Sequence, residues 1–212
     1  MKPPGHTTIQ WDPAFRIIAA RFPAVDLWPG LPPDLWERLD QVEELTRSGI
    51  HQGRDGSSYS HWPFDNPRPG RFSTATLGAF YAARYELGAV AETVHQQVIR
   101  CREDRLDPHE FDMQVLSVAI AGRFHDLRGK RAEPFPGVMD PGSHQASQAL
   151  AEELHRLGSL GIVFTSVRSD LLCPCVAAFQ PTTIQRCSHL RFLTYHWDGV
   201  KVVPLYEKKP LG

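Results

Sequence analysis

Cysteine is scarce in this 212-residue chain, and long hydrophobic runs are missing. Its four cysteines are too few for a scaffold held together by disulfides, and a reducing cytosol would keep them as thiols. No apolar run follows the first residues, Met1 to His6, so we expect neither a signal peptide nor a membrane-spanning helix. These absences predict a cytosolic protein that does not act at a membrane.

A charge excess of either sign is also missing. The chain has 23 basic and 24 acidic side chains and a formal net charge of -1. Sequence-independent binding of nucleic acid or of anionic lipid needs a basic excess, so neither is expected as a general partner. A small pocket lined by basic residues remains compatible with this balance.

Proline and glycine divide the chain into segments. The 18 prolines and 16 glycines stay below the roughly 25–30% that is typical of low-complexity disorder. Proline is excluded from helix interiors and central strands, so regular structure is expected in windows without it. Four such windows are 34–62, 70–107, 109–133 and 142–173. No internal repeat is visible, and the length predicts a single domain over 1–212.

The spacing of apolar residues predicts three helices in these windows. The first begins near Asp34, the second runs from Leu87 to about Arg102, and the third follows Ser143. Gly158 is a typical residue to end the third helix. The three apolar stripes are Leu35, Leu39, Val42 and Leu45; then Leu87, Val90, Val94 and Val98; then Ala146, Leu150, Leu154 and Leu157.

Short apolar runs predict strands elsewhere. They cover residues 77–83, 161–165, 176–179, 190–197 and 200–203. The Asp198-Gly199 turn makes the last two a C-terminal hairpin over about 190–206. The segment from Met113 to Ala121 fits either a strand or a short helix, and the polar stretch 49–69 predicts a long loop insert. Helices mixed with hairpin-like strands favour an α+β fold over a doubly wound sheet.

Two arginines lie at positions where core packing does not explain a charged residue. Arg71 follows Gly70 at the entrance to the predicted strand 77–83. A guanidinium suits phosphate or carboxylate, and glycine lets a ligand approach the backbone. Arg16 lies inside the apolar run 15–18. For each arginine, a solvated side chain remains the alternative interpretation.

Glu92 and Ser166 are the other polar candidates. Glu92 lies at the edge of the buried stripe of the second predicted helix, where a carboxylate is costly unless it is paired or functional. Ser166 directly follows the predicted strand 161–165, and strand ends are common catalytic positions. An exposed glutamate and a turn-forming serine remain the alternatives.

Taken together, these segments resemble the RES domain family, which is named for its arginine, glutamate and serine. The resemblance covers about residues 15–181. It implies that Arg71, Glu92 and Ser166 form the catalytic set, and that the substrate is bound by further pocket residues. Those residues are Arg16 and Tyr81, together with Arg71.

The resemblance also implies a fold and an activity. The fold would be of the diphtheria-toxin ADP-ribosyltransferase type, with a mixed β core and flanking helices. The activity would be degradation of NAD as a substrate, by phosphorolysis or hydrolysis, without a further cofactor. Members of the family commonly act as toxins, each paired with an antitoxin that has a DNA-binding domain.

The sequence leaves two other functions open. It also leaves open whether the chain forms a homo-oligomer. One of the two functions is transfer of ADP-ribose to a macromolecule. The other is a non-catalytic RES-like module that binds a partner through Trp28, Trp36 or the 49–69 loop.

A metal site is weighed against the four thiols. Cys173, Cys175, Cys187 and His189 supply four candidate zinc ligands, but a single residue separates the first pair, where two to four are usual. The ten histidines form no His-Glu-x-x-His arrangement. We therefore expect buried or reactive thiols and no metal.

Overall fold

The computed structural model describes residues 2–20, 57–168 and 172–208. The helix predicted from Asp34 lies outside these residues. The elements of the described ranges are β1 (His6–Ala19), α2 (Ser57–Asp65), β2 (Phe80–Ala83), α3 (Glu86–Glu103), β3 (His109–Leu127), α4 (Gln145–Arg156), β4 (Gly161–Thr165), β5 (Pro174–Ala178), β6 (Ile184–Trp197) and β7 (Val202–Lys208), with short 3₁₀ turns at Gly129–Ala132 and Pro181–Thr183. None of the helices in these ranges is both long enough and apolar enough to cross a membrane.

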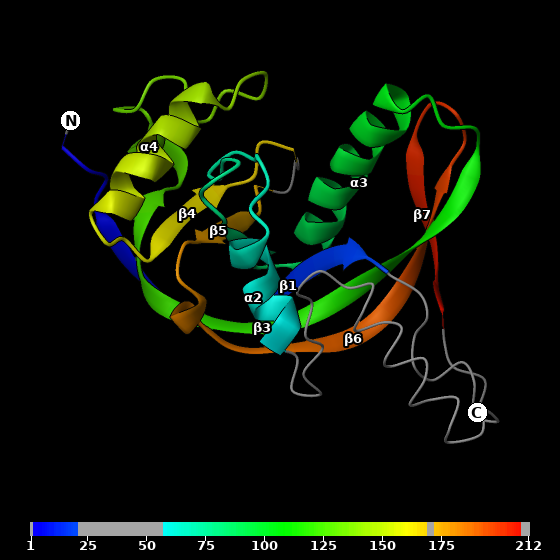
Figure 1. Cartoon of the computed structure of the whole chain (residues 1–212), viewed down its shortest axis with the longest axis horizontal. Helices are drawn as coiled ribbons and strands as arrows, with labels where there is room; N and C mark the ends of the chain where they lie inside the picture. The colour runs from blue at the N-terminus through cyan, green and yellow to red at the C-terminus, as the bar shows by residue number, and fades with distance from the viewer. Residues whose placement is uncertain (1, 21–56, 169–171, 209–212) are drawn as a thin grey trace.

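The seven described strands form one mixed sheet in the order β1-β2-β5-β4-β3-β6-β7. The pairing of β3 with β4 is parallel, whereas the other pairings in the described chain are antiparallel. β3 also pairs back onto β1, so the first five strands in the order close into a ring. Figure 1 shows α4 near one end of the long strands and α3 near the other. The predicted α+β class with a mixed β core is confirmed.

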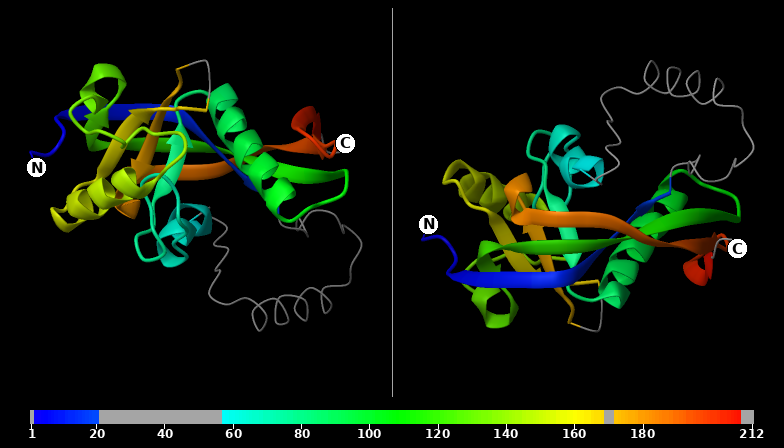
Figure 2. Two further views of the ribbon diagram at one scale, coloured as in Figure 1. Left: turned by 90° about the horizontal axis from the view of Figure 1, so that it is seen from above. Right: turned by 90° about the horizontal axis from the view of Figure 1, so that it is seen from below.

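The segment that fitted either a strand or a short helix is part of β3, the longest of the described strands. Residues 113–121 lie within this 19-residue strand, which pairs with β1 on one edge and with β6 on the other. The two views of Figure 2 show β1, β3 and β6 running side by side. Pairing on both edges satisfies the backbone, so the apolar residues of this segment are stable as a central strand.

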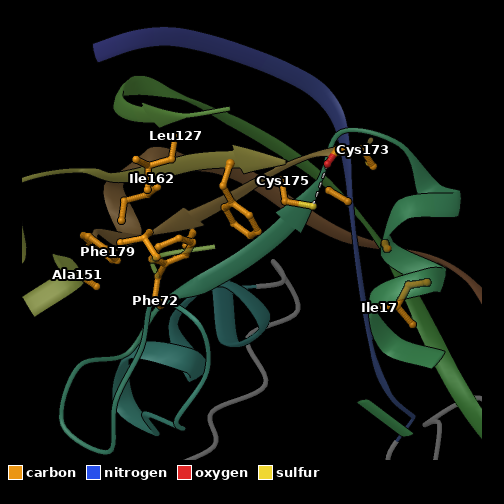
Figure 3. Packing of buried hydrophobic residues seen from close by; sticks show 14 of the residues in the cluster. Ile17, Phe72, Leu127, Ala151, Ile162, Cys173, Cys175 and Phe179 are labelled. Atoms are coloured by element: carbon orange, nitrogen blue, oxygen red, sulfur yellow. Dashed lines mark hydrogen bonds between the residues drawn. The ribbon is translucent and has the colours of Figure 1, made fainter. Parts of the chain in front are cut away.

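The core has two parts, one on each face of the sheet. Helices α3 and α4 cover one face and α2 contributes to the other. Neighbouring residues of β4 alternate between them: Ile162 belongs to the first cluster and Val163 to the second. A strand buried on both faces needs apolar residues at every position, which explains the continuous run 161–165. Figure 3 shows the first cluster, in which Phe72 packs edge-on against Phe164 with ring centroids 5.0 Å apart.

Helix α4 matches its prediction except at its ends. Leu150 and Leu154 are buried, and Gly158 follows the helix with a positive φ of 74°. Leu157 was predicted to be part of the apolar stripe, but its side chain is 66% exposed because the helix ends at Arg156 and Leu157 is its C-cap. The residue that caps the N-terminus is His144, one position after the predicted Ser143.

Helix α3 confirms the predicted span, and three of the four predicted stripe residues, Val90, Val94 and Val98, pack partly buried against the first core cluster. Leu87 is 67% exposed, whereas Ala89 and Thr93 are buried. Thr93 can be buried because its hydroxyl bonds to Ala89 O and to the hydroxyl of Tyr195. Hydrophobic spacing therefore predicts the core side of the helix but misses Ala89 and Thr93, because these buried residues are small or polar.

The predicted loop insert 49–69 is wrong over Ser57–Asp65, where the chain forms α2. Nearby glycines and Pro63 favour a loop, but Tyr59 and Phe64 pack against the second core cluster. This packing stabilises the helix where local propensity does not.

The C-terminal hairpin is confirmed and is longer than its prediction. β6 and β7 pair antiparallel from Trp197 and Val202 outward. The carboxylate of Asp198 accepts hydrogen bonds from the backbone N–H groups of Val200 and Lys201, both at 2.8 Å, which fixes the turn. The strand predicted over 77–83 is limited to Phe80–Ala83.

Candidate functional site

A cavity of about 430 Å³, here called the central cavity, lies where β1, β2, α3 and the end of β4 meet. Four of the five predicted site residues line it: Arg16, Arg71, Tyr81 and Glu92. The fifth, Ser166, is buried and contacts Glu92. A second cavity of about 420 Å³, near the C-terminal end of α3, contains none of the five. The fold therefore brings together candidates that are up to 150 residues apart in the sequence.

Glu92 and Ser166 form a direct hydrogen bond. The Ser166 hydroxyl donates to Glu92 Oε1 at 2.5 Å and accepts the backbone N–H of Arg168 at 3.0 Å. Its own N–H donates to Cys173 O at 2.9 Å, which continues the strand pairing beyond the end of β4. Ser166 thus fixes the carboxylate and the chain that leads to Arg168.

Arg71 is held by backbone carbonyls. Its Nη1 donates to Val138 O at 3.2 Å and to Asp140 O at 2.9 Å, and its side chain is only partly accessible from the cavity. Burial and the positive charge of Arg168 lower the pKa of Arg71, while the negative charge of Glu92 acts in the opposite direction. Carbonyls orient the guanidinium without neutralising it, so its charge stays available to a ligand.

The turn that carries Arg71 is fastened from two sides. The Tyr81 hydroxyl accepts the N–H of Phe72 at 2.8 Å and donates to Ser73 Oγ at 3.1 Å. From α4, the amide of Gln148 donates to Gly70 O at 2.9 Å and to Ser73 O at 3.1 Å. A Cβ at Gly70 would lie 2.9 Å from Ser73 Oγ and 3.2 Å from Tyr81 Oη, so a larger residue there would displace the hydroxyls that fasten the turn. Tyr81 therefore positions Arg71 through its hydroxyl.

Arg16, on β1, is also part of the cavity lining. Its Nη1 donates to Tyr81 O at 3.0 Å, and its guanidinium lies 4.6 Å from the centre of the Phe80 ring. Its Nε is buried and has no hydrogen-bond partner in the described part of the chain. Burial lowers the pKa of Arg16 to about 10, so the group remains charged at neutral pH. A positive charge held beside a cavity favours an anionic ligand there.

Sequence reasoning missed four lining residues that carry charge or can titrate: Arg68, Arg168, His95 and His144. Arg168 had a signal, because it follows Ser166 by two positions within the segment that resembles the RES family. Among the described residues, the cavity lining has four arginines and one carboxylate, that of Glu92. This imbalance favours a ligand with negative charge.

The four thiols are buried and free. Cys175 lines the central cavity and donates to Cys173 O at 3.7 Å, as the dashed line in Figure 3 shows. Cys187 lies in the other core cluster, on the opposite face of the sheet. Cys187 is therefore separated from the Cys173–Cys175 pair with which the zinc interpretation grouped it. Among the residues that the structure describes, no group of three candidate metal ligands assembles.

The chain is similar to a solved structure and matches a protein family. A chain of the crystal structure of the M. tuberculosis MbcT-MbcA toxin-antitoxin complex is similar over 86% of both chains, with 13% sequence identity and a TM-score of 0.48. This structural similarity is too weak to indicate a function. The search of curated proteins gave no match. The model of the RES domain matches residues 44–198, which is more than half of the sequence. The chain therefore belongs to the RES domain family, as its sequence predicted.

Proposed function

We propose that this protein degrades NAD by cleaving the bond between nicotinamide and ribose, with phosphate or water as the acceptor. One observation carries the proposal: the carboxylate of Glu92 is held by Ser166 in a cavity that four arginines of the described chain also line. The cavity volume of about 430 Å³ lies within the usual range of small-molecule sites, about 300–1,000 Å³. RES family membership supports the same activity.

The chemistry needs little acid catalysis. Cleavage expels nicotinamide as a neutral base from a cationic pyridinium, and the ribose passes through an oxocarbenium-like transition state. Glu92 stabilises that positive charge or holds a ribose hydroxyl. The positive charge moves from the pyridinium ring to the ribose as the bond breaks, so a carboxylate fixed beside the ribose favours the transition state over the substrate.

The remaining candidates bind and orient the dinucleotide. Arg16 and Arg71 donate charge-assisted hydrogen bonds to the pyrophosphate. The Tyr81 ring stacks on the nicotinamide, while its hydroxyl keeps the Arg71 turn in place. Ser166 orients Glu92 and the incoming acceptor.

The same proposal extends to the fold type and the setting. The family resemblance supports a core of the diphtheria-toxin ADP-ribosyltransferase type. It also supports a role in the cytosol as the toxin of a toxin–antitoxin pair, whose DNA-binding antitoxin covers the cavity in the resting cell. Co-purification from native cells tests the partner, and a free chain under every growth condition would count against it.

Nicotinamide release tests the activity. The purified chain, free of any bound partner, is incubated with NAD in the presence and absence of phosphate. We expect release by the unsubstituted chain and a large loss in Glu92→Ala, with no loss in Glu152→Ala, since Glu152 is exposed on α4. Equal inactivity of the unsubstituted chain and of Glu92→Ala, both folded, would refute the proposal. Label from NAD that stays on a macromolecule would instead indicate ADP-ribosyl transfer.

A further inference from the structure

Two arginines of the central cavity are anchored to the same short segment. Arg71 donates to the carbonyls of Val138 and Asp140, and Arg168 Nη2 donates to the carbonyl of Pro141 at 2.6 Å. The segment 138–141 thus holds both guanidinium groups at one wall of the cavity. Carbonyl dipoles orient the two groups but leave both positive charges in place.

No carboxylate in the described residues pairs with either arginine. Asp140 is near, but its Oδ1 accepts the N–H of Gly142 at 2.8 Å, and Glu92 accepts the Ser166 hydroxyl. The two arginines repel each other, since the charge of Arg168 contributes to the lowered pKa of Arg71. The charges of Glu92 and Asp140 raise the pKa of Arg71 and so offset this repulsion in part, but neither carboxylate makes a direct ion pair with it. An anion that binds between the two guanidinium groups would stabilise them further.

His144 completes the group. It lies next to the anchoring segment, at the N-terminus of α4, and lines the same cavity. Burial lowers its pKa, and the charges of Arg71 and Arg168 lower it further. A neutral imidazole can still donate one hydrogen bond, so His144 adds a donor beside the two guanidinium groups.

We propose that Arg71, Arg168 and His144 form a subsite for a phosphate group, with Arg168 as the residue that determines its affinity. The inference rests on the proposed function, because it places a phosphate group in the cavity where NAD would be cleaved. Arg16 is not part of this subsite, because it is not anchored to the segment 138–141 but donates to Tyr81 O and lies over the Phe80 ring. The phosphate group comes either from inorganic phosphate, the acceptor, or from the pyrophosphate of the dinucleotide.

Calorimetry with two probes separates these sources. Inorganic phosphate tests the acceptor, and ADP-ribose, which has the pyrophosphate but no nicotinamide, tests the dinucleotide. We expect Arg168→Gln to weaken binding of one probe or the other by about ten- to hundredfold, the effect of losing a charged hydrogen bond. Arg84→Gln is the matched control, because Arg84 also donates to a carbonyl at 2.6 Å, that of Pro13, but does not line the cavity.

The outcomes are distinct for the subsite and for the proposed function. Arg168→Gln and Arg84→Gln with equal affinity for both probes, or no measurable binding of either probe, would overturn the subsite. Arg168→Lys, which keeps the charge, should recover part of the affinity and shows that a loss is not unfolding. Binding that depends on Arg168, in a chain that releases no nicotinamide, would support the subsite and refute the proposed function. Nicotinamide release, together with affinities for both probes that do not depend on Arg168, would support the proposed function and refute the subsite.

Discussion

The Ser166 hydroxyl donates a 2.5 Å hydrogen bond to Glu92 Oε1, across 74 positions of sequence. This bond joins the end of β4 to α3 at the edge of the central cavity. Ser166 is buried, and its Oγ also accepts the Arg168 N–H, so one hydroxyl aligns the Glu92 carboxylate and the segment that leads to Arg168. The arrangement makes the effects of Glu92 and Ser166 interdependent.

A double-mutant cycle tests that dependence. We expect Glu92→Gln to lower kcat for nicotinamide release about 100- to 1000-fold, because it removes the charge and keeps the shape. Ser166→Ala should lower kcat about tenfold by releasing the carboxylate. In the double variant the Ser166→Ala change should add little, since its target is already lost. Ser143→Ala, at an exposed serine before α4, is the control; additive losses would contradict the positioning role.

Tyr81→Phe separates the ring from the hydroxyl. The change leaves the Phe72 N–H without its partner, so unfolding should become easier by about 1–3 kcal/mol. The Arg71 turn should loosen, and turnover of NAD should fall although the aromatic ring is kept. Thermal melts and steady-state kinetics measure the two effects. Tyr59→Phe, which removes a hydroxyl that accepts from Gln114 outside the cavity, should leave turnover unchanged.

Two leucines of one helix turn should differ strongly in their contribution to stability. Leu154, on the inner side of α4, is fully buried, so Leu154→Ala should lower the free energy of unfolding by about 2–5 kcal/mol. Leu157 is 66% exposed, and Leu157→Ala should change it by less than about 0.5 kcal/mol. Urea unfolding of both variants checks this, and similar losses would mean that the apolar stripe does extend to Leu157.

Asp126 should contribute stability that depends on pH. Its carboxylate is almost fully buried and bonds to the guanidinium and the N–H of Arg128, with Arg131 nearby. Burial alone would raise the pKa of Asp126, but the hydrogen bonds and charge of Arg128, with the charge of Arg131, lower it overall. A lowered folded-state pKa gives stability that is present above the ordinary aspartate pKa of about 3.9 and is lost as the pH falls through the folded-state value.

Comparison of the unsubstituted chain with Asp126→Asn measures this contribution. The variant should be less stable at pH 7, and the difference should shrink as the pH falls below about 4. Urea unfolding at several pH values gives both curves. A difference that stays constant down to pH 2 would show that the carboxylate charge contributes nothing.

Local pattern was sufficient for much of the secondary structure. The spacing of Leu150 and Leu154, with Gly158 after them, predicts α4, and the Asp198-Gly199 turn predicts the last hairpin, because both signals lie within a few residues of each other. It failed for α2, where Tyr59 and Phe64 are stabilised by partners far along the chain. On α3 it placed Val90, Val94 and Val98 on the core side correctly, but it wrongly included the exposed Leu87 and missed the buried Thr93, whose hydroxyl bonds to that of Tyr195.

By itself the sequence determined the class of fold, the family and the candidate residues Arg16, Arg71, Tyr81, Glu92 and Ser166. Only the tertiary structure decided how they meet. Pairing of β1 with β3 and of β2 with β5 brings the arginines to one cavity, and the backbone of 138–141 selects Arg168 as a further member. The physical reason is that propensity and periodicity act over a few residues, whereas the orientation of a side chain depends on strand register and on hydrogen bonds across the whole chain.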